Sequence, residues 1–600
     1  MCSVRLIEMQ ADRRIRGHEG PTRRIMLMWA ALSLIFLAVG MERLVQGQFP
    51  DPDDALRLVQ IRDLLAGQNW WDMHQYRIDP AADGSGGTLM HWSRLVDIPV
   101  ALIILVLTPL FGASAAETTA LIVVPLLTLG AILFVIGRLA WRLFDRDVAG
   151  FSCLCVGLLA PLVFQLQPMR IDHHGWQIFT VALALWACSF RSPWKGGAAA
   201  GFAMAVGASI SIEILPMVAA FGGILALRWF RDKAQRWWLV GYMQALALGL
   251  VAAFFAARGV NDLAQHCDVI SPAHLGFFVI TAVATGLIAA GPAIPRPALF
   301  LAFGAAGIAG LAFFGLSSPG CLMTPFAQLD PLVRDFWYIN VLEGRPVWEQ
   351  NLPYALPTLV QLAVALAACL ALYMRSHDWL RVWWCEYAIL LAASILLSIF
   401  VWRSAAFAAV IAAIPLGWVT TRLLMRLRAA RDLKLKMFAA GAIVFVLLPS
   451  TPVVLVEMSM PKSGNVQTVL VEESSCQIRD QAAKLNTLPA GTIFAPLDIG
   501  PALLVKSHHA VVATGHHRAE ASMRDIIYAF TSPDAEARKV FAAHGADYLV
   551  MCTDLAEPRL FSAANPDGLT AQLVSGNTPD WLVPAAINGP AEFRVWRVVK

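Results

Sequence analysis

The sequence predicts a polytopic α-helical membrane protein with about 13 transmembrane helices, followed by a C-terminal soluble α/β domain. Three observations lead to this fold class. First, 58% of the 600 residues are hydrophobic and only 15% are charged, whereas soluble domains carry about 25% charged residues. Second, fourteen apolar runs are close to the length that a helix needs to cross a membrane. Third, the chain changes character near residue 457, where short apolar runs and polar segments alternate.

The first apolar run is interpreted as a retained transmembrane helix. Arginines cluster before it, and no small-residue cleavage site with a polar mature domain follows it, as a signal peptide would require. The N-terminus is therefore expected in the cytoplasm. The fourteen runs lie near 25–43, 97–113, 117–137, 148–166, 175–191, 196–212, 213–229, 237–257, 274–292, 297–316, 354–374, 384–401, 403–421 and 437–456.

Basic residues in the short loops indicate which runs cross the membrane. The loops after 117–137, 175–191, 213–229 and 403–421 are rich in Arg and Lys, which favours the cytoplasmic side. These loops fall on one side only if the run 97–113 does not cross, so that segment is expected to lie at the outer surface. Thirteen crossings then place the C-terminus outside; a bundle of fourteen spans is the alternative. Four of the predicted outer segments are of interest for function: 44–116, 167–174, 317–353 and 457–600.

The residues after 457 are expected to form a separate α/β domain, distinct from a transmembrane domain at 1–456. Short apolar runs begin at Thr492, Ala510 and Asp547 and are typical of strands. The stretch 519–543 has a helical period, with Pro533 at a helix start. Strands that alternate with helices predict a small α/β fold.

The cysteines give no metal-binding spacing. Five of the ten lie in apolar runs and are expected to pack there. Four others fall in predicted outer segments, where disulfides persist. Pairs Cys267–Cys321 and Cys476–Cys552 are compatible with this placement, although the sequence does not fix the pairing.

A group of acidic residues follows the first apolar run. Asp51, Asp53 and Asp54 lie at the predicted mouth of the bundle, and Arg57 comes one helical turn later. Asp and Pro are common at helix starts, so capping accounts for one of the three acids. The other two predict a charged site beside the membrane.

Three further motifs place polar residues on the same side. The segment Arg170-Ile-Asp-His-His contains Asp172 and His174, an oxygen and a nitrogen ligand spaced to bind one divalent ion; an interfacial polar cluster is the alternative. Glu343 is a third oxygen ligand or a base, or else a solvated surface group. Arg403 begins a late apolar run and is placed to bind a phosphate, with snorkelling at the membrane surface as the alternative. Additional candidates, without an assigned role, are His91 and Glu213.

These motifs together predict a site that binds a divalent cation, Mg²⁺ or Mn²⁺, and the phosphates of a lipid-linked sugar. The cation would offset charge on the departing phosphate while a carboxylate takes the proton of the acceptor. Direct displacement at the anomeric carbon would invert its configuration. The net charge of +4 is too small to indicate a nucleic-acid partner.

The motifs resemble those of the oligosaccharyltransferase catalytic subunits, which belong to the GT-C glycosyltransferase superfamily. Asp51-Pro-x-x-x-x-Arg57 is similar to the first outer-loop motif of that family, and Asp172-His-His is similar to its second acidic motif. The segment 341–348 resembles a later loop motif with a glutamate followed by proline and tryptophan. Arg403 with Phe407 resembles the arginine and aromatic residue that contact the donor phosphates.

The resemblance implies roles for individual residues. Asp51 and Glu343 would be catalytic, and Arg403 would hold the donor phosphates. The implied metal ligands are Asp51, Asp172, His174 and Glu343. The family's Trp-Trp-Asp-Tyr-Gly signature is missing, because the corresponding segment reads Ala495-Pro-Leu-Asp-Ile-Gly, which keeps only Asp498 and the glycine. Recognition of the glycosylation sequon is therefore not expected.

A histidine-rich segment in the C-terminal domain adds further candidates. His516, His517 and Arg518 would contact donor phosphate or acceptor if they face the membrane site; otherwise they are surface residues.

The predicted function is transfer of a sugar or oligosaccharide from a polyprenyl phosphate or pyrophosphate to a lipid, glycan or protein acceptor. The reaction would take place on the extracytoplasmic side of a plasma or inner membrane, with the C-terminal domain in the periplasm or outside. Two alternatives are a transporter or flippase for a lipid-linked or anionic solute and a catalytically silent scaffold. Transporters usually place polar groups near the membrane midplane, whereas here they concentrate in outer segments.

Overall fold

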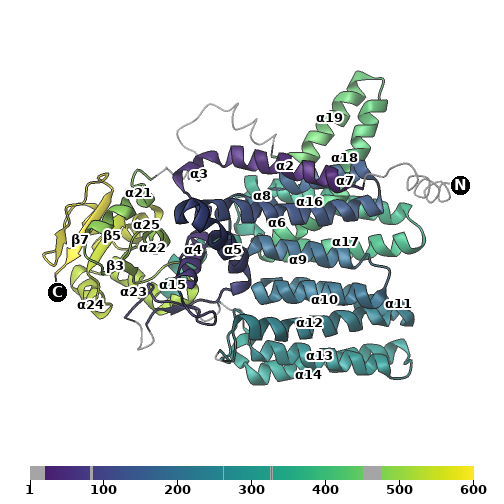
Figure 1. The fold of residues 1–600 in the computed structure, drawn as a ribbon, viewed down its shortest axis with the longest axis horizontal. Helices are drawn as coiled ribbons and strands as arrows, with labels where there is room; N and C mark the ends of the chain where they lie inside the picture. The colour runs from purple at the N-terminus through teal and green to yellow at the C-terminus, as the bar shows by residue number, and fades with distance from the viewer. Residues whose placement is uncertain are drawn as a thin grey trace.

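The computed structural model describes residues 20–450 and 474–599, except for 82–85, 261, 324–325 and 327–328. Within this part of the chain, a large helical bundle carries a smaller α/β unit beyond one end (Figure 1). The fold class predicted from the sequence is confirmed. The predicted domain boundary at 457 and the N-terminal arginines up to Arg16 lie outside the described residues.

The helices of the bundle coincide with the predicted apolar runs. The last run, 437–456, extends beyond residue 450 and so lies partly outside the described residues. The first helices are α2 (Thr22–Val39), α3 (Met41–Gln46), α4 (Pro52–Leu65), α5 (Arg94–Phe111), α6 (Ala113–Leu143), α7 (Arg146–Leu158), α8 (Ala160–Leu166), α9 (His174–Ala187) and α10 (Pro193–Ile210). The later ones are α11 (Leu215–Arg231), α12 (Arg236–Ala257), α13 (Pro272–Ala290), α14 (Arg296–Ser317), α16 (Leu352–Arg375), α17 (Asp378–Phe400), α18 (Ala405–Ala429) and α19 (Leu433–Leu447).

Ten helices among the described residues are long and apolar enough to span a membrane. Helices α7 and α8 form an eleventh candidate that is bent by 70° at Leu159. Their break is explained by Pro161, because a proline is favoured in the first turn of a new helix and cannot continue the old one.

Helix α5 covers most of the run 97–113, which was expected to lie at the outer surface. Its length and composition would allow it to span a membrane. Its buried side chains pack with α4, with the first half of α6 and with Met169 and Ile171. The surface position of this helix stays a prediction.

Close approach of backbones holds the bundle together. Residues 405–421 of α18 are buried on almost all sides, and many of them are small. A Cβ added at Gly417 would lie 2.6 Å from the backbone nitrogen of Ser152 on α7. Helices α10 and α12 meet in the same way, because Gly197 and Gly201 contact backbone carbonyls of α12. Small residues at helix interfaces are the usual packing device in lipid, where no hydrophobic effect drives association.

The C-terminal unit is built on a five-stranded sheet with the order β4-β3-β5-β7-β6. The first three strands in that order are parallel, and β7 and β6 add antiparallel pairs. The strands are β3 (Thr492–Phe494), β4 (Ala510–Val511), β5 (Tyr548–Cys552), β6 (Leu582–Pro584) and β7 (Phe593–Val598). The helices around them are α21 (Ile478–Ala482), α22 (Gly500–Lys506), α23 (Glu520–Thr531), α24 (Asp534–Ala543), α25 (Ala556–Ala564) and α26 (Leu569–Val574). The three predicted strands and the helix start at Pro533 are confirmed.

The first outer segment joins the bundle to this sheet. It contains the small hairpin β1 (His74–Gln75) and β2 (Thr88–Leu89), and its Ile78 pairs with Val511 at the edge of β4. Arg77 donates to the carbonyl oxygens of Ser507 and His509. Figure 1 shows α4, α5 and the short helix α15 (Pro331–Phe336) between the bundle and the α/β unit.

Two disulfides lie in the predicted outer segments. Cys267 bonds to Cys321, and Cys476 bonds to Cys552. Both pairs are those that the predicted placement allowed.

Candidate functional site

The acidic group at the start of α4 is held by one buried arginine. Asp51 caps the helix, because its Oδ1 accepts the backbone N–H of Asp53 at 2.9 Å. Its other oxygen lies 3.0 Å from Nη1 of Arg170, and the same nitrogen lies 3.1 Å from Oδ2 of Asp54. Capping therefore occupies one oxygen of one acid, and the remaining carboxylate oxygens contribute to a charged site.

The segment before α9 brings Asp172 and two histidines to the same place. The backbone N–H of Asp172 donates to Asp54 at 2.8 Å. The Asp172 carboxylate contacts Nδ1 of His173 at 2.5 Å and Nε2 of His174 at 3.4 Å. Although burial opposes its ionisation, the two histidines hold the pKa of Asp172 well below its usual value. Met169, just before this segment, adopts a positive φ of 67°, a conformation that is uncommon outside functional sites and turns.

A second cation completes the site on the side of α18. Arg403, in the turn Trp402–Ser404, lies 2.9 Å from Glu213 and 3.5 Å from Glu343. Glu213 also lies 4.0 Å from Nδ1 of His174, so it links the histidine to the arginine. Burial raises the pKa of Glu343, and Arg403 opposes that shift. Glu213 and Glu343 therefore belong to one polar group with Arg403.

Asp53 is the acid without a cation. Within the described residues, no arginine, lysine or histidine pairs with its carboxylate. Burial, followed by the neighbouring Asp51 and Asp172 carboxylates, raises the pKa of Asp53 well above its usual value. Its position against these acids makes Asp53 part of the site rather than a surface residue.

The charges of the site leave an excess of acid that suits a divalent cation. Six carboxylates face two arginines, and a third arginine, Arg57, lies 3.6 Å from Asp172, which leaves a formal excess of three negative charges before any histidine is protonated. Carboxylate oxygens with one or two imidazoles form a donor set for a divalent metal. One ligand atom each from Asp172, His173 and His174 lies within 4.8 Å of the others, and Nε2 of His173 is buried without a hydrogen-bond partner. The six acids are Asp51, Asp53, Asp54, Asp172, Glu213 and Glu343, and the arginines are Arg170 and Arg403.

Arg57 lies behind Asp172 and supports it. Its fully buried guanidinium lies 2.8 Å from Asp97 and 3.6 Å from Asp172, and stacks over the ring of Trp92. Arg94 also contacts Asp97. The sequence analysis missed Asp97, whose signal was an acid in the first turn of an otherwise apolar helix.

The histidines of the C-terminal unit lie apart from this acidic group. His516 and His517 pack against His91 of the first outer segment, with ring centroids 4.9 and 4.7 Å from the His91 ring. His517 and Arg518 both pair with Asp268, which the sequence analysis did not single out. Trp92 connects the two groups, because its ring contacts both His516 and Arg57. The predicted contact of these residues with donor phosphate remains a prediction.

A cavity of about 300 Å³ opens beside Asp51. It lies between the first outer segment and the α/β unit, and Asp51, Asp498, Arg479 and Lys506 line it. The backbone N–H of Asp498 donates to Glu557 at 2.7 Å. The predicted residue Asp498 thus shares a cavity wall with the acidic site.

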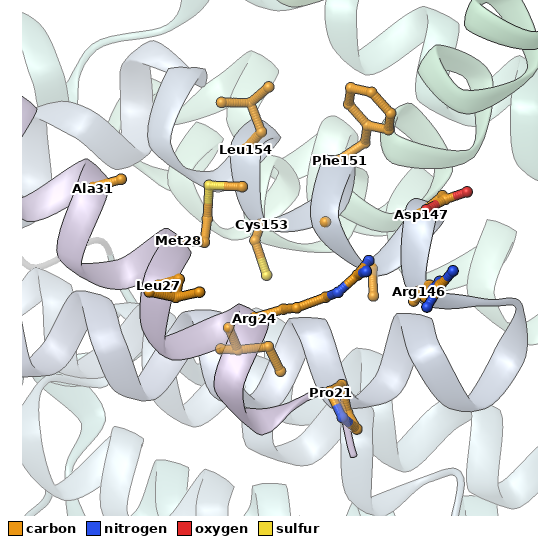
Figure 2. Close-up of a pocket in the computed structure, with 13 residues that line it drawn as sticks. Pro21, Arg24, Leu27, Met28, Ala31, Arg146, Asp147, Phe151, Cys153 and Leu154 are labelled. Atoms are coloured by element: carbon orange, nitrogen blue, oxygen red, sulfur yellow. The ribbon is translucent and has the colours of Figure 1, made fainter. Parts of the chain in front are cut away.

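A larger cavity of about 440 Å³ has no residue in common with the acidic site. It lies between α2 and α7, and its lining is mostly apolar (Figure 2). Figure 2 shows the Arg24 side chain extending toward Arg146 at the start of α7. An apolar cleft between two helices of a membrane bundle suits lipid chains, and none of its lining residues belongs to the acidic site.

Comparison with known proteins shows a shared fold at remote sequence identity. No protein-family model matches the chain, and no curated protein matches it in sequence. The oligosaccharyltransferase AglB of Archaeoglobus fulgidus, in complex with an inhibitory peptide and a dolichol phosphate, is similar in structure with a TM-score of 0.63 and 14% identity. That match covers 96% of this chain and 74% of AglB.

Two other structures of the same archaeal enzyme are also similar. One carries a tethered acceptor peptide with an NVT sequon and has a TM-score of 0.60 at 13% identity, covering 96% of this chain and 74% of the enzyme. The other is a complex with Zn and sulfate and has a TM-score of 0.54 at 13% identity, covering 95% and 72%. The chain therefore shares the fold of these oligosaccharyltransferase structures, as the resemblance of its motifs implied.

Proposed function

We propose that this chain is a membrane glycosyltransferase that moves a sugar or oligosaccharide from a polyprenyl phosphate or pyrophosphate to an acceptor. The observation that carries the proposal is the convergence of acids, histidines and Arg403 from five separate segments on one polar site at one end of the bundle. The structurally similar AglB was solved with a dolichol phosphate, which agrees with a lipid-linked donor.

Arg403 binds the donor phosphates in this proposal. Its two terminal nitrogens contact Glu213 and Glu343, while its Nε is buried without a hydrogen-bond partner. The guanidinium thus keeps a donor for a phosphate oxygen, and charge-assisted bonds of this kind are stronger than neutral ones. Because Arg403 starts α18 at the end of the bundle, a polyprenyl chain attached to the phosphate can lie along the bundle in the membrane.

The carboxylates activate the acceptor. Asp51 or Glu343 takes the proton from the acceptor nucleophile as its lone pair attacks the anomeric carbon. The bond from that carbon to the phosphate oxygen breaks, and the polyprenyl phosphate or pyrophosphate leaves with the bonding electrons. A single displacement inverts the anomeric configuration. Asp53, whose pKa is raised by burial and by the neighbouring acids, is a further carboxyl group beside these two.

A divalent cation fits the excess acid of the site. Asp51, Asp53, Asp172, His174 and Glu343 would hold it, and when bound it would offset negative charge on the phosphate. Arg57 and Arg170 keep the Asp172 carboxylate in place beneath it. The AglB complex with Zn and sulfate supports a metal in this fold.

The acceptor enters through the 300 Å³ cavity beside Asp51. No tryptophan lines that cavity, and Arg479, Lys506 and Asp498 make it polar. The lining lacks the aromatic platform that would recognise the Ser or Thr of a sequon. A lipid, a glycan or another protein site therefore fits it better as the acceptor.

The site faces the extracytoplasmic side, with the N-terminus in the cytoplasm. The two disulfides support this orientation, because they persist in oxidising compartments. The basic loops support it too, since Arg146 and Arg231 lie at ends of helices opposite to the acidic site.

A transporter remains the second candidate, but the positions of the charged groups disfavour it. Arg228 and Glu386 form a buried ion pair between two candidate spans, in the last turn of α11 and the first half of α17. Transporters usually place charged groups near the midplane, whereas this pair lies toward one end of its helices.

The test is transfer from defined polyprenyl-linked sugars by the purified protein in detergent, with and without chelator. We expect Asp51→Asn and Glu343→Gln to lower turnover by about 100-fold or more, the scale of a lost acid–base group. Glu349→Gln, in the same loop as Glu343 but paired only with Arg345, should leave turnover unchanged. Equal turnover in all three variants would remove the proposed site, and uptake of solute without covalent product would favour the transporter.

A further inference from the structure

Three histidines from distant parts of the chain meet outside the acidic site. His91 belongs to the first outer segment, and His516 and His517 follow strand β4 of the C-terminal unit. The ring centroids are 4.9 Å apart for His91 and His516, 4.7 Å for His91 and His517, and 5.1 Å for His516 and His517. The three rings thus form a nearly equilateral triangle.

This triangle has the dimensions of a tetrahedral metal site. With metal–nitrogen bonds of about 2.0–2.1 Å and tetrahedral angles, three imidazole rings have centroids about 5 Å apart. One ligand atom of each histidine lies within 4.8 Å of the others. His91 Nδ1 and His516 Nε2 are 2.8 Å apart, so binding would require them to separate by about half an ångström.

One contact around the triangle is typical of a metal-bound histidine. Nε2 of His517 lies 2.8 Å from Asp268, the carboxylate contact that commonly orients a metal-bound histidine. Asp268 is itself fixed by two bonds from Arg518 and by the neighbouring Cys267–Cys321 disulfide.

We propose that His91, His516 and His517 bind one zinc-like transition-metal ion, with water in the fourth position, that ties the first outer segment to the C-terminal unit. An all-imidazole site selects Zn²⁺ or a similar borderline ion, whereas Mg²⁺ and Mn²⁺ prefer the carboxylates of the acidic site. This ion is separate from the cation of the proposed glycosyl transfer, and its role is to join segments 425 residues apart in the chain.

The test is metal analysis of the purified full-length protein after dialysis against zinc. The wild type should hold one zinc equivalent more than His91→Ala and His516→Ala, while His508→Ala, an exposed histidine in the same unit, should match the wild type. His174→Gln, at the acidic site, should keep the equivalent. Asp268→Asn should weaken zinc binding by about 10–100-fold, the usual effect of losing such a carboxylate.

Cobalt and thermal unfolding provide readouts that do not depend on catalysis. Cobalt in the wild type should give the intense visible absorption of a four-coordinate ion, and His516→Ala should lose it. Removing zinc from the wild type by chelator should lower its unfolding temperature reversibly. A zinc content that is equal in the wild type and both alanine variants would overturn the proposal. So would a variant that raises the KM for the donor while zinc stays unchanged, because that result assigns the histidines to phosphate.

Discussion

Removal of Arg170 should destabilise the protein strongly, because this side chain is the cation for buried acids. Its side chain is 1% exposed, and it lies 3.0 Å from Asp51 and 3.1 Å from the fully buried Asp54. Taking away one partner of a buried ion pair costs about 3–5 kcal/mol, since the remaining charge is left without compensation. Arg170→Met should therefore lower the free energy of unfolding by about that amount.

A second substitution separates the charge effect from lost packing. Asn at position 54 keeps an oxygen that accepts the backbone N–H of Asp172 but removes the carboxyl group, which is charged above a pKa that burial raises to about 8. Arg170→Met with Asp54→Asn should thus be more stable than Arg170→Met, with a coupling energy of about 1–3 kcal/mol. The matched control is Arg345→Met, whose pair with Glu349 is partly exposed and worth less than about 1 kcal/mol.

Unfolding can be followed with a thiol-reactive dye in detergent. Four free cysteines are buried in the bundle and become reactive only when it opens: Cys153, Cys155, Cys188 and Cys369. Arg170→Met that unfolds like the wild type would refute the reasoning. A double variant no more stable than Arg170→Met would show that packing, not charge, sets the cost.

Two other predictions concern packing and pH. Gly417→Ala should lower the unfolding temperature markedly, because its Cβ would lie 2.6 Å from a backbone nitrogen of α7. The control is Gly441→Ala, whose Cβ meets nothing within 4 Å and should leave the unfolding temperature unchanged. Equal effects of the two substitutions would contradict the close contact between α18 and α7. Burial alone would lower the pKa of His544, but hydrogen bonds with Asp525 and Asp79 raise it to about 9. Because the pKa of His544 is higher in the folded than in the unfolded protein, protonated His544 stabilises the folded state fully below the unfolded-state pKa of about 6.5. This stabilisation is lost as pH rises through the folded-state pKa of about 9. Unfolding temperatures measured between about pH 6 and 10 should show this loss in the wild type and not in His544→Ala. The same pH dependence in both proteins would contradict a stabilising contact of His544 with Asp79 and Asp525.

The long helices of the bundle and three of the strands, β3, β4 and β5, were predictable from local pattern, whereas β6 and β7 were not predicted. Apolar runs of membrane length became helices because every backbone polar group in lipid must bond within its own segment. The strand at Tyr548 and the helix start at Pro533 follow from local propensity in the same way.

The partners of the charged residues were not predictable in this way. Asp97 carried no motif, yet it is the buried partner of Arg57. Glu213 had no role until Arg403 was found beside it. Asp268 belonged to no predicted motif, but it contacts Nε2 of His517. Each pairing depends on a distance between segments far apart in the chain, and the sequence has no signal for that distance.

By itself, then, the amino-acid order determined that most of this chain lies in a membrane and that acids, histidines and arginines gather in a few segments between helices. Only the tertiary structure decided which of them meet: Arg170 among the acids of α4, Arg403 between Glu213 and Glu343, and His91 against His516. The physical reason is that hydrophobicity acts locally and leaves a periodic pattern along the chain, whereas the strength of an ion pair or a ligand set depends on separations in space that only packing fixes.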